Sequence, residues 1–195
     1  MSKPTIVIDK HELALCANAA RTRHNNGRKN KRKDVSSSAH SSFMIDLIGV
    51  CGEVALIKYF NLDINWHDIL TAFGTTDVGD CWEVRSVSQP HYHLCMWTGG
   101  GADETKIKKK LMSAWSKVVV KVVSYEQATC MLDGWALGYD IRDFGYQTCD
   151  KNNPFAENRI QRPSVIYDNW YLREHISPEQ DMNVIRYLRS QFQHK

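Results

Sequence analysis

Four charged side chains, Asp77, Asp80, Glu83 and Arg85, lie close together in the stretch TDVGDCWEVRS, which covers residues 76–86. Glu83 and Arg85 are two residues apart in a run that alternates like a strand, so their side chains are expected to project from one face. Asp77 precedes them across a turn that contains Gly79, which would bring its carboxylate alongside Glu83. Carboxylate oxygens beside a cation are the groups that a divalent metal ion and a phosphate require.

A third carboxylate comes from a different part of the chain. Glu53 lies within an expected helix over residues 42–60, three residues after Val50 and four before Ile57. That spacing puts Glu53 at the edge of the apolar stripe, away from open water. Two glycines near it would let the helix approach a sheet closely. We therefore expect Glu53 to reach the same site.

Together these residues predict a site that binds Mg²⁺ or Mn²⁺. Glu53, Asp77 and Glu83 are the expected ligands, with Asp80 as an alternative to Asp77. Arg85 is expected to stabilise the charge that grows on an attacked phosphate. The metal ion would polarise a phosphoryl oxygen and lower the pKa of a bound water. The same residues also fit a simpler alternative, a Glu83–Arg85 ion pair on a solvent-facing strand with unrelated acids nearby.

Basic residues gather in two segments, although the net charge of the chain is only +3. Such patches suit a polyanion, because each phosphate contact releases counterions. Two solvated loops are the alternative interpretation. The residues expected to bind nucleic acid are Arg28, Lys29, Lys31, Arg32, Lys33, Lys106, Lys108, Lys109 and Lys110.

The order of expected elements predicts a single α+β domain over residues 1–195. The apolar periodicities change from helical to alternating and back to helical along the chain. A polar, basic and serine-rich segment, about residues 25–42, is expected to be a mobile loop. The expected helices cover about 8–24, 42–60 and 177–193, and the expected strands cover 81–87, 91–97, 117–123 and 130–139.

The composition of the chain indicates which cellular location to expect. No apolar run is long enough to span a membrane, and the N-terminus lacks the pattern of a signal peptide. The six cysteines are scattered singly, which favours reduced thiols over a disulfide scaffold or a zinc ribbon. We therefore expect a cytoplasmic protein without a membrane partner.

Several short motifs occur in a fixed order over about residues 42–172. They are Gly52-Glu53-Val54-Ala55, Asp77-Val78-Gly79, Glu83-Val84-Arg85-Ser86, Gly134-Trp135-Ala136-Leu137-Gly138 and Arg162-Pro163. This order resembles the PD-(D/E)-x-K nuclease superfamily, and more narrowly a group of small phage-type proteins of that fold. The resemblance implies a restriction-endonuclease-like fold, in which a mixed central sheet is flanked by helices.

The resemblance also implies a function and assigns roles to four residues. Glu53 would be the helix carboxylate, Asp77 the motif aspartate, Glu83 the second strand carboxylate and Arg85 the basic residue. The implied activity is Mg²⁺-dependent hydrolysis of phosphodiester bonds in DNA, with RNA as an alternative substrate, in the cytoplasm of a host cell. A homodimer is plausible, because many enzymes of this fold pair to cut both strands.

Arg85 departs from the pattern of this superfamily, in which most active members carry lysine. Arginine stays charged at any working pH, so it can stabilise a phosphate but cannot accept a proton. The alternative function is therefore a catalytically inactive protein of this fold that binds nucleic acid or a host protein. A third interpretation, a structural virion component, predicts an oligomer interface in place of a basic groove.

The segment His91-Tyr92-His93 puts two imidazoles on one face of an expected strand. Some zinc sites use this spacing, but no third ligand with a defined spacing accompanies it. We expect a structural or surface role for both histidines.

Overall fold

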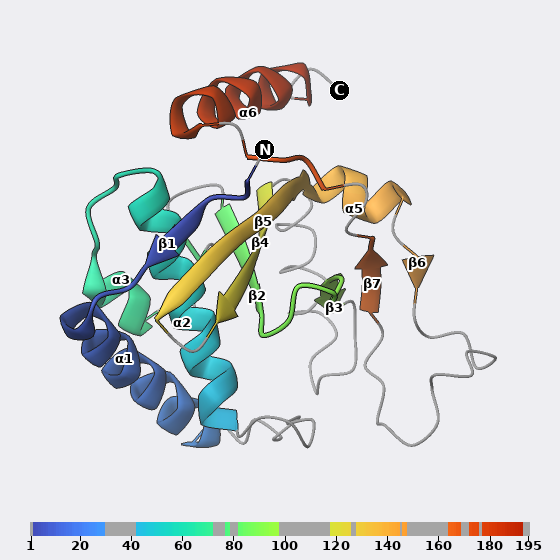
Figure 1. Cartoon of the computed structure of the whole chain (residues 1–195). Coiled ribbons are helices and arrows are strands. Elements are labelled where there is room, and N and C mark those ends of the chain that lie inside the picture. Colours follow the sequence, from blue (N-terminus) through green and yellow to red (C-terminus); the bar gives the residue numbers. More distant parts are fainter. Residues whose placement is uncertain are drawn as a thin grey trace.

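The computed structural model describes residues 2–29, 42–71, 77–78, 82–97, 118–125, 128–144, 146–147, 164–168, 172–175 and 177–192. Among these residues, three helices follow the first strand, and four strands follow those helices; Figure 1 labels all the elements. In chain order they are β1 (Thr5–Val7), α1 (Lys10–Lys29), α2 (Ser42–Tyr59), α3 (Trp66–Thr71), β2 (Trp82–Val87), β3 (Leu94–Trp97), β4 (Val118–Tyr125), β5 (Thr129–Leu137), α5 (Gly138–Phe144), β6 (Tyr146–Gln147), β7 (Ser164–Tyr167) and α6 (Pro178–Phe192).

A four-stranded sheet forms the centre of the fold, with the strand order β1-β5-β4-β2. β2 and β4 run parallel, whereas β4–β5 and β5–β1 are antiparallel, so the sheet is mixed. A smaller antiparallel sheet has the order β3-β7-β6 and lies to one side (Figure 1). The predicted α+β class, with a mixed sheet flanked by helices, is therefore confirmed.

Helix α2 packs across the central sheet, and α1 packs against α2 (Figure 1). The apolar face of α2 meets valines of β2 and β4, and Val54, Val84 and Val120 all belong to this core. Almost every residue from Val50 to Ile57 is buried, which explains the long apolar pattern of this helix. No helix in the described part of the chain is long and apolar enough to cross a membrane.

Helix α1 begins with a reciprocal capping box and is longer than predicted. Asp9 Oδ1 accepts from the Glu12 N–H, and Glu12 Oε2 accepts from the Asp9 N–H, both over 2.8 Å. The helix ends at Lys29, so residues 25–29 of the expected loop are helical. His24, the last residue of the predicted helix, packs edge-on against Phe43 of α2. Residues 30–41 lie outside the described part.

Helix α6 starts where the sequence predicts. Ser177 Oγ accepts from the Gln180 N–H over 3.2 Å, and Pro178 is the first helical residue. A buried network joins the helix to the rest of the fold: Asp181 accepts from the Tyr59 hydroxyl and contacts His175 Nδ1, each over 2.8 Å. The predicted helix over about residues 177–193 is therefore confirmed.

Strand β5 contains an irregularity at Gly134, within the strand predicted over residues 130–139. The pairing with β4 shifts register beside Lys121, and Gly134 has a φ of 156°. A Cβ at Gly134 would lie 2.9 Å from both the Arg173 carbonyl oxygen and Leu172 Cβ. Glycine therefore lets the 172–175 segment pair with Trp135 through two backbone hydrogen bonds.

Three other boundaries differ from the prediction. Residues 66–71 form helix α3 in the expected connection, and residues 138–144 form helix α5 at the expected end of a strand. The expected strand over 91–97 begins only at Leu94, because the residues after Pro90 form a turn closed by the Tyr92 N–H and the Gln89 carbonyl.

Candidate active site at the junction of α2 and β2

Glu53 is buried against Arg23, a residue of α1. Only 5% of Glu53 is exposed. Arg23 donates from Nη1 to Glu53 Oε1 over 2.6 Å and from Nη2 to Glu53 Oε2 over 2.7 Å. The Arg23 Nε donates to the carbonyl of Ile69 in α3 over 2.7 Å. The guanidinium thus connects α1, α2 and α3 at one point.

The segments that carry the predicted acids meet at Val84 in β2. Asp77 Oδ2 accepts from the backbone N–H of Val84 over 2.9 Å, and Glu83 precedes Val84 in the strand. On the other side, a Cβ added to Gly52 would lie 3.3 Å from Val84 Cγ1 and would clash with the Ser86 hydroxyl. Gly52 therefore keeps α2 close to β2, and Glu53 follows it directly.

Glu83 is buried, and Arg85 extends from it toward the surface. Glu83 is 1% exposed, whereas 33% of the Arg85 side chain is exposed. Arg85 Nη2 donates to Glu83 Oε1 over 2.6 Å, which agrees with the predicted common face. The alternative of a solvent-facing ion pair does not hold for Glu83. The Nε of Arg85 is buried and has no hydrogen-bond partner among the residues that the structure describes.

The acids of this junction influence one another electrostatically. Burial raises the pKa of Glu53 to about 7, although the Arg23 guanidinium opposes this shift. The negative charges of Asp77 and Glu83 raise the pKa of Glu53 further. Glu53, Asp77, Glu83, Arg23 and Arg85 form what we call the acidic site.

The donors of the acidic site fit a hard divalent ion in their chemistry, because all three are carboxylates. Among the described residues, no group of three His, Cys, Asp or Glu side chains is arranged to hold a metal ion. The two buried acids are instead paired with arginines: both oxygens of Glu53 contact Arg23, and one oxygen of Glu83 contacts Arg85. A metal ion at this site would have to replace those contacts.

Many of the predicted site residues lie outside the described part of the chain, so their positions stay predictions. Arg28 and Lys29 are the last two residues of α1. The predicted residues outside the described ranges are Asp80, Lys31, Arg32, Lys33, Lys106, Lys108, Lys109 and Lys110.

A second buried ionic cluster lies on β4 and β5. Lys121 is fully buried, and its Nζ contacts Asp133 Oδ2 over 2.6 Å and donates to the Pro90 carbonyl over 2.8 Å. Lys3 donates to the other oxygen of Asp133. Lys121 is also the β4 partner of Arg85. We call Lys3, Lys121 and Asp133 the Lys121 cluster.

The sequence interpretation missed Arg23 and the Lys121 cluster. Arg23 did carry a signal, because it follows Cys16 and Ala20 at helical spacing on the buried side of α1. A basic residue on an apolar stripe needs a buried acid. Lys121 stands in a run of valines, but the identity of its partner depends on strand pairing and has no local signal.

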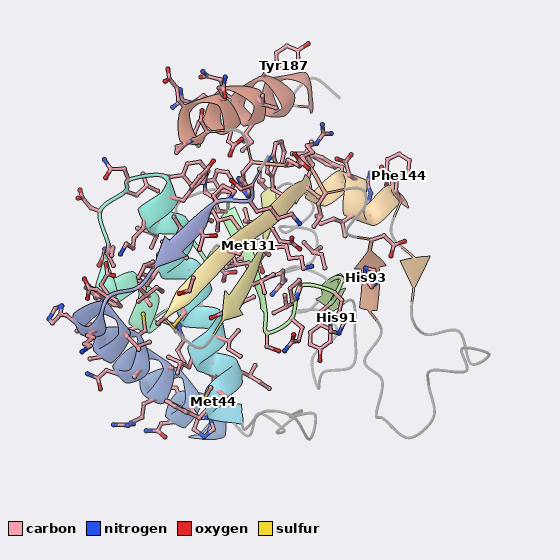
Figure 2. All side chains as sticks on the ribbon, viewed as in Figure 1. Met44, His91, His93, Met131, Phe144 and Tyr187 are labelled. Atoms are coloured by element: carbon pink, nitrogen blue, oxygen red, sulfur yellow. The ribbon has the colours of Figure 1, made fainter. Side chains whose placement is uncertain are left out.

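The histidine pair does not form a metal site in the described structure. His91 and His93 project from the turn before β3 (Figure 2) and are exposed. His93 Nδ1 lies 3.4 Å from an oxygen of Asp168. The expected surface role for both residues is consistent with this position.

Comparisons with protein-family models, with curated proteins and with solved structures found no match to this chain.

Proposed function

We propose that the protein is a Mg²⁺- or Mn²⁺-dependent nuclease of restriction-endonuclease-like fold that hydrolyses phosphodiester bonds in DNA. One observation carries the proposal: the segments with Glu53, Asp77 and Glu83 meet at Val84, although two of these acids are buried. Burying several acids together opposes their ionisation, and strongly shifted carboxyl groups concentrate at functional sites.

The residues of the acidic site have separate roles in this proposal. Glu53, Asp77 and Glu83 would hold the ion, which supplies a polarised phosphoryl oxygen and a water of lowered pKa. Arg85, whose buried Nε has no acceptor in the described part of the chain, would donate to the phosphate and stabilise its charge. Arg85 cannot act as a general base, because arginine keeps its proton at neutral pH.

A second candidate function is supported by the ion pairs of the acidic site. Arg23 and Arg85 neutralise the two buried acids without any metal ion. A protein of this fold that only binds nucleic acid, or a host protein, does not need a metal ion at the acidic site, and ion pairs there are sufficient. In this case the basic segments would hold the ligand and no bond would be broken.

A cleavage assay separates the two candidates. Linear, supercoiled and single-stranded DNA and a structured RNA are incubated with the wild type, in Mg²⁺, Mn²⁺ or EDTA. The matched variants are Glu83→Gln and Glu179→Gln, the latter on the exposed side of α6. We expect metal-dependent cutting of DNA that Glu83→Gln lowers by about 100-fold or more and that Glu179→Gln leaves unchanged. Binding of DNA without cutting in any metal would favour the second candidate.

A further inference from the structure

The C-terminal helix α6 is attached to the fold through a buried group of three ionisable side chains. Asp181 of α6 is buried, and its Oδ2 accepts from the Tyr59 hydroxyl of α2 and contacts His175 Nδ1, each over 2.8 Å. The His175 side chain is fully buried. The rings of His175 and Tyr59 meet edge to face, with their centroids 5.1 Å apart. We call His175, Asp181 and Tyr59 the α6 network.

Few residues of α6 between Pro178 and Tyr187 are buried. Asp181 and Ile185 are buried and Met182 is half-buried, whereas the other residues of this range are exposed. The helix lies outside the layers that α1, α2 and the central sheet form (Figure 1), and Tyr187 points away from the rest of the fold (Figure 2). The attachment of α6 therefore depends on a narrow stripe, in which Asp181 is the charged member.

The α6 network accommodates a neutral imidazole better than a charged one. The Asp181 carboxylate accepts from an N–H at Nδ1 of His175, which leaves Nε2 without a proton in the neutral ring. Nε2 is buried and has no hydrogen-bond partner in the described part of the chain. A second proton would therefore place a buried donor where no described acceptor meets it, which is unfavourable. Burial lowers the pKa of His175, although the hydrogen bond and the charge of Asp181 oppose this shift.

The ionisable groups around His175 come from three parts of the chain. Helix α6 contributes Asp181, the charged group that acts on the imidazole among the described residues, and α2 contributes the Tyr59 hydroxyl. On the segment before His175, Arg173 lies over the ring of a tryptophan of β5, and Glu174 is exposed. Protonation of the ring is therefore opposed by burial and favoured by Asp181 alone, and the lowered pKa shows that burial has the larger effect.

We propose that protonation of His175 in mild acid releases α6 from the fold, so that the α6 network is a pH-sensitive attachment of this helix. The attached helix requires the neutral ring, whereas the released segment takes up a proton at the ordinary histidine pKa of 6.5. The attachment is therefore complete above pH 6.5 and weakens as the pH falls below this value. The inference does not depend on the nuclease proposal, because no member of the α6 network belongs to the acidic site.

An NMR titration of the full chain from pH 8 to pH 5 tests the proposal. Ring ¹⁵N shifts report the protonation of His175, and amide exchange, divided by the intrinsic rate at each pH, reports the protection of each element. We expect a proton on Nδ1 alone at pH 8. As the second proton binds, the protection of residues 178–187 should fall by about three- to tenfold. Strand β4, which reports unfolding of the whole domain, should lose much less protection.

Two variants assign the effect to one histidine. His175→Asn can still donate to Asp181 but does not titrate, so its α6 protection should be independent of pH. His91→Asn changes an exposed histidine in the turn before β3 and should keep the wild-type loss.

The proposal is overturned if α6 keeps its protection at pH 5, or if His175→Asn shows the same loss as the wild type. Equal losses in α6 and β4 overturn it as well, because they report unfolding of the whole domain. If His175→Asn does not fold, the wild-type titration decides: a loss in α6 that follows the ring shifts of His175 supports the proposal, and a loss at a different pH overturns it.

Discussion

The acidic site and the Lys121 cluster both contain buried acids paired with basic side chains, and both lie beside β2 or β4, yet the pKa values of Glu53 and Asp133 are shifted in opposite directions. In the acidic site, three acids face two arginines, and burial raises the pKa of Glu53 to about 7. In the Lys121 cluster, two lysines face one acid. Burial alone would raise the pKa of Asp133, but hydrogen bonds from Lys121 and Lys3 hold it below its ordinary value.

This difference separates a structural cluster from a functional candidate. The Lys121 cluster stabilises the charge of its acid and connects β4, β5 and the N-terminal residues. The acidic site keeps an acid where its charge is poorly stabilised, which lowers stability unless another ligand supplies positive charge. We therefore expect mutations in the Lys121 cluster to act on folding and mutations in the acidic site to act on metal binding.

The largest effect on stability is expected from Asp133→Ala. This change removes the carboxylate that contacts Nζ of the fully buried Lys121 over 2.6 Å. Loss of one member of a buried pair costs about 3–5 kcal/mol. Urea unfolding measures the loss, and the double variant Lys121→Met/Asp133→Leu should recover much of it. A loss of Mn²⁺ binding in a folded Asp133 variant would contradict the separation of the two regions.

Glu53→Gln should change the pH dependence of stability. In the wild type, the raised pKa makes Glu53 favour folding below about pH 4.5, and this contribution disappears as the pH rises through about 7. The span from 4.5 to about 7 corresponds to about 3 kcal/mol. Unfolding free energies at pH 5 and pH 8 should show the wild type losing stability relative to Glu53→Gln. If the wild type and Glu53→Gln lose the same unfolding free energy between pH 5 and pH 8, burial does not raise the pKa of Glu53.

Gly52→Ala should move the acidic site while leaving the Lys121 cluster in place. The added methyl group clashes with the Ser86 hydroxyl and lies 3.2 Å from Ser86 Cβ, so α2 must shift from β2. Overpacking of this kind costs about 1–3 kcal/mol. Thermal unfolding and Mn²⁺ titration should both report a loss. Unchanged Mn²⁺ affinity would mean that the close approach of α2 does not position Glu53.

Gly49→Ala, one turn earlier on α2, is the matched control and should have the smallest effect. Nothing lies within 4 Å of an added Cβ at this position. Replacing a helical glycine by alanine there should stabilise the protein by about 0.5–1 kcal/mol. If Gly49→Ala is destabilised, any methyl group on this face of α2 disturbs the helix. The loss in Gly52→Ala would then not be evidence for the close approach of α2 to β2.

The local features of this fold could be predicted from the sequence. The apolar spacing around Glu53 correctly placed it away from open water, and alternation placed Glu83 and Arg85 on one face of β2. The cap at Ser177 was also recognisable, because serine and proline at these positions satisfy a helix start by themselves.

The remaining features depend on contacts between distant residues. Arg23 and His24 of α1 contact Glu53 and Asp46 of α2, and no pattern within α1 identifies these partners. The bulge at Gly134 is explained only by the 172–175 segment, which follows almost forty residues later. The partner of Lys121 is set by that same register shift, so no local pattern indicates it.

A Mn²⁺-soaked crystal, measured at a wavelength where manganese scatters anomalously, tests the central claim most directly. The account predicts an anomalous peak among the carboxylates of Glu53, Asp77 and Glu83, with the Arg23 guanidinium turned away from Glu53. The contradictory result is a map without a peak there at saturating Mn²⁺, in which Arg23 still holds both oxygens of Glu53.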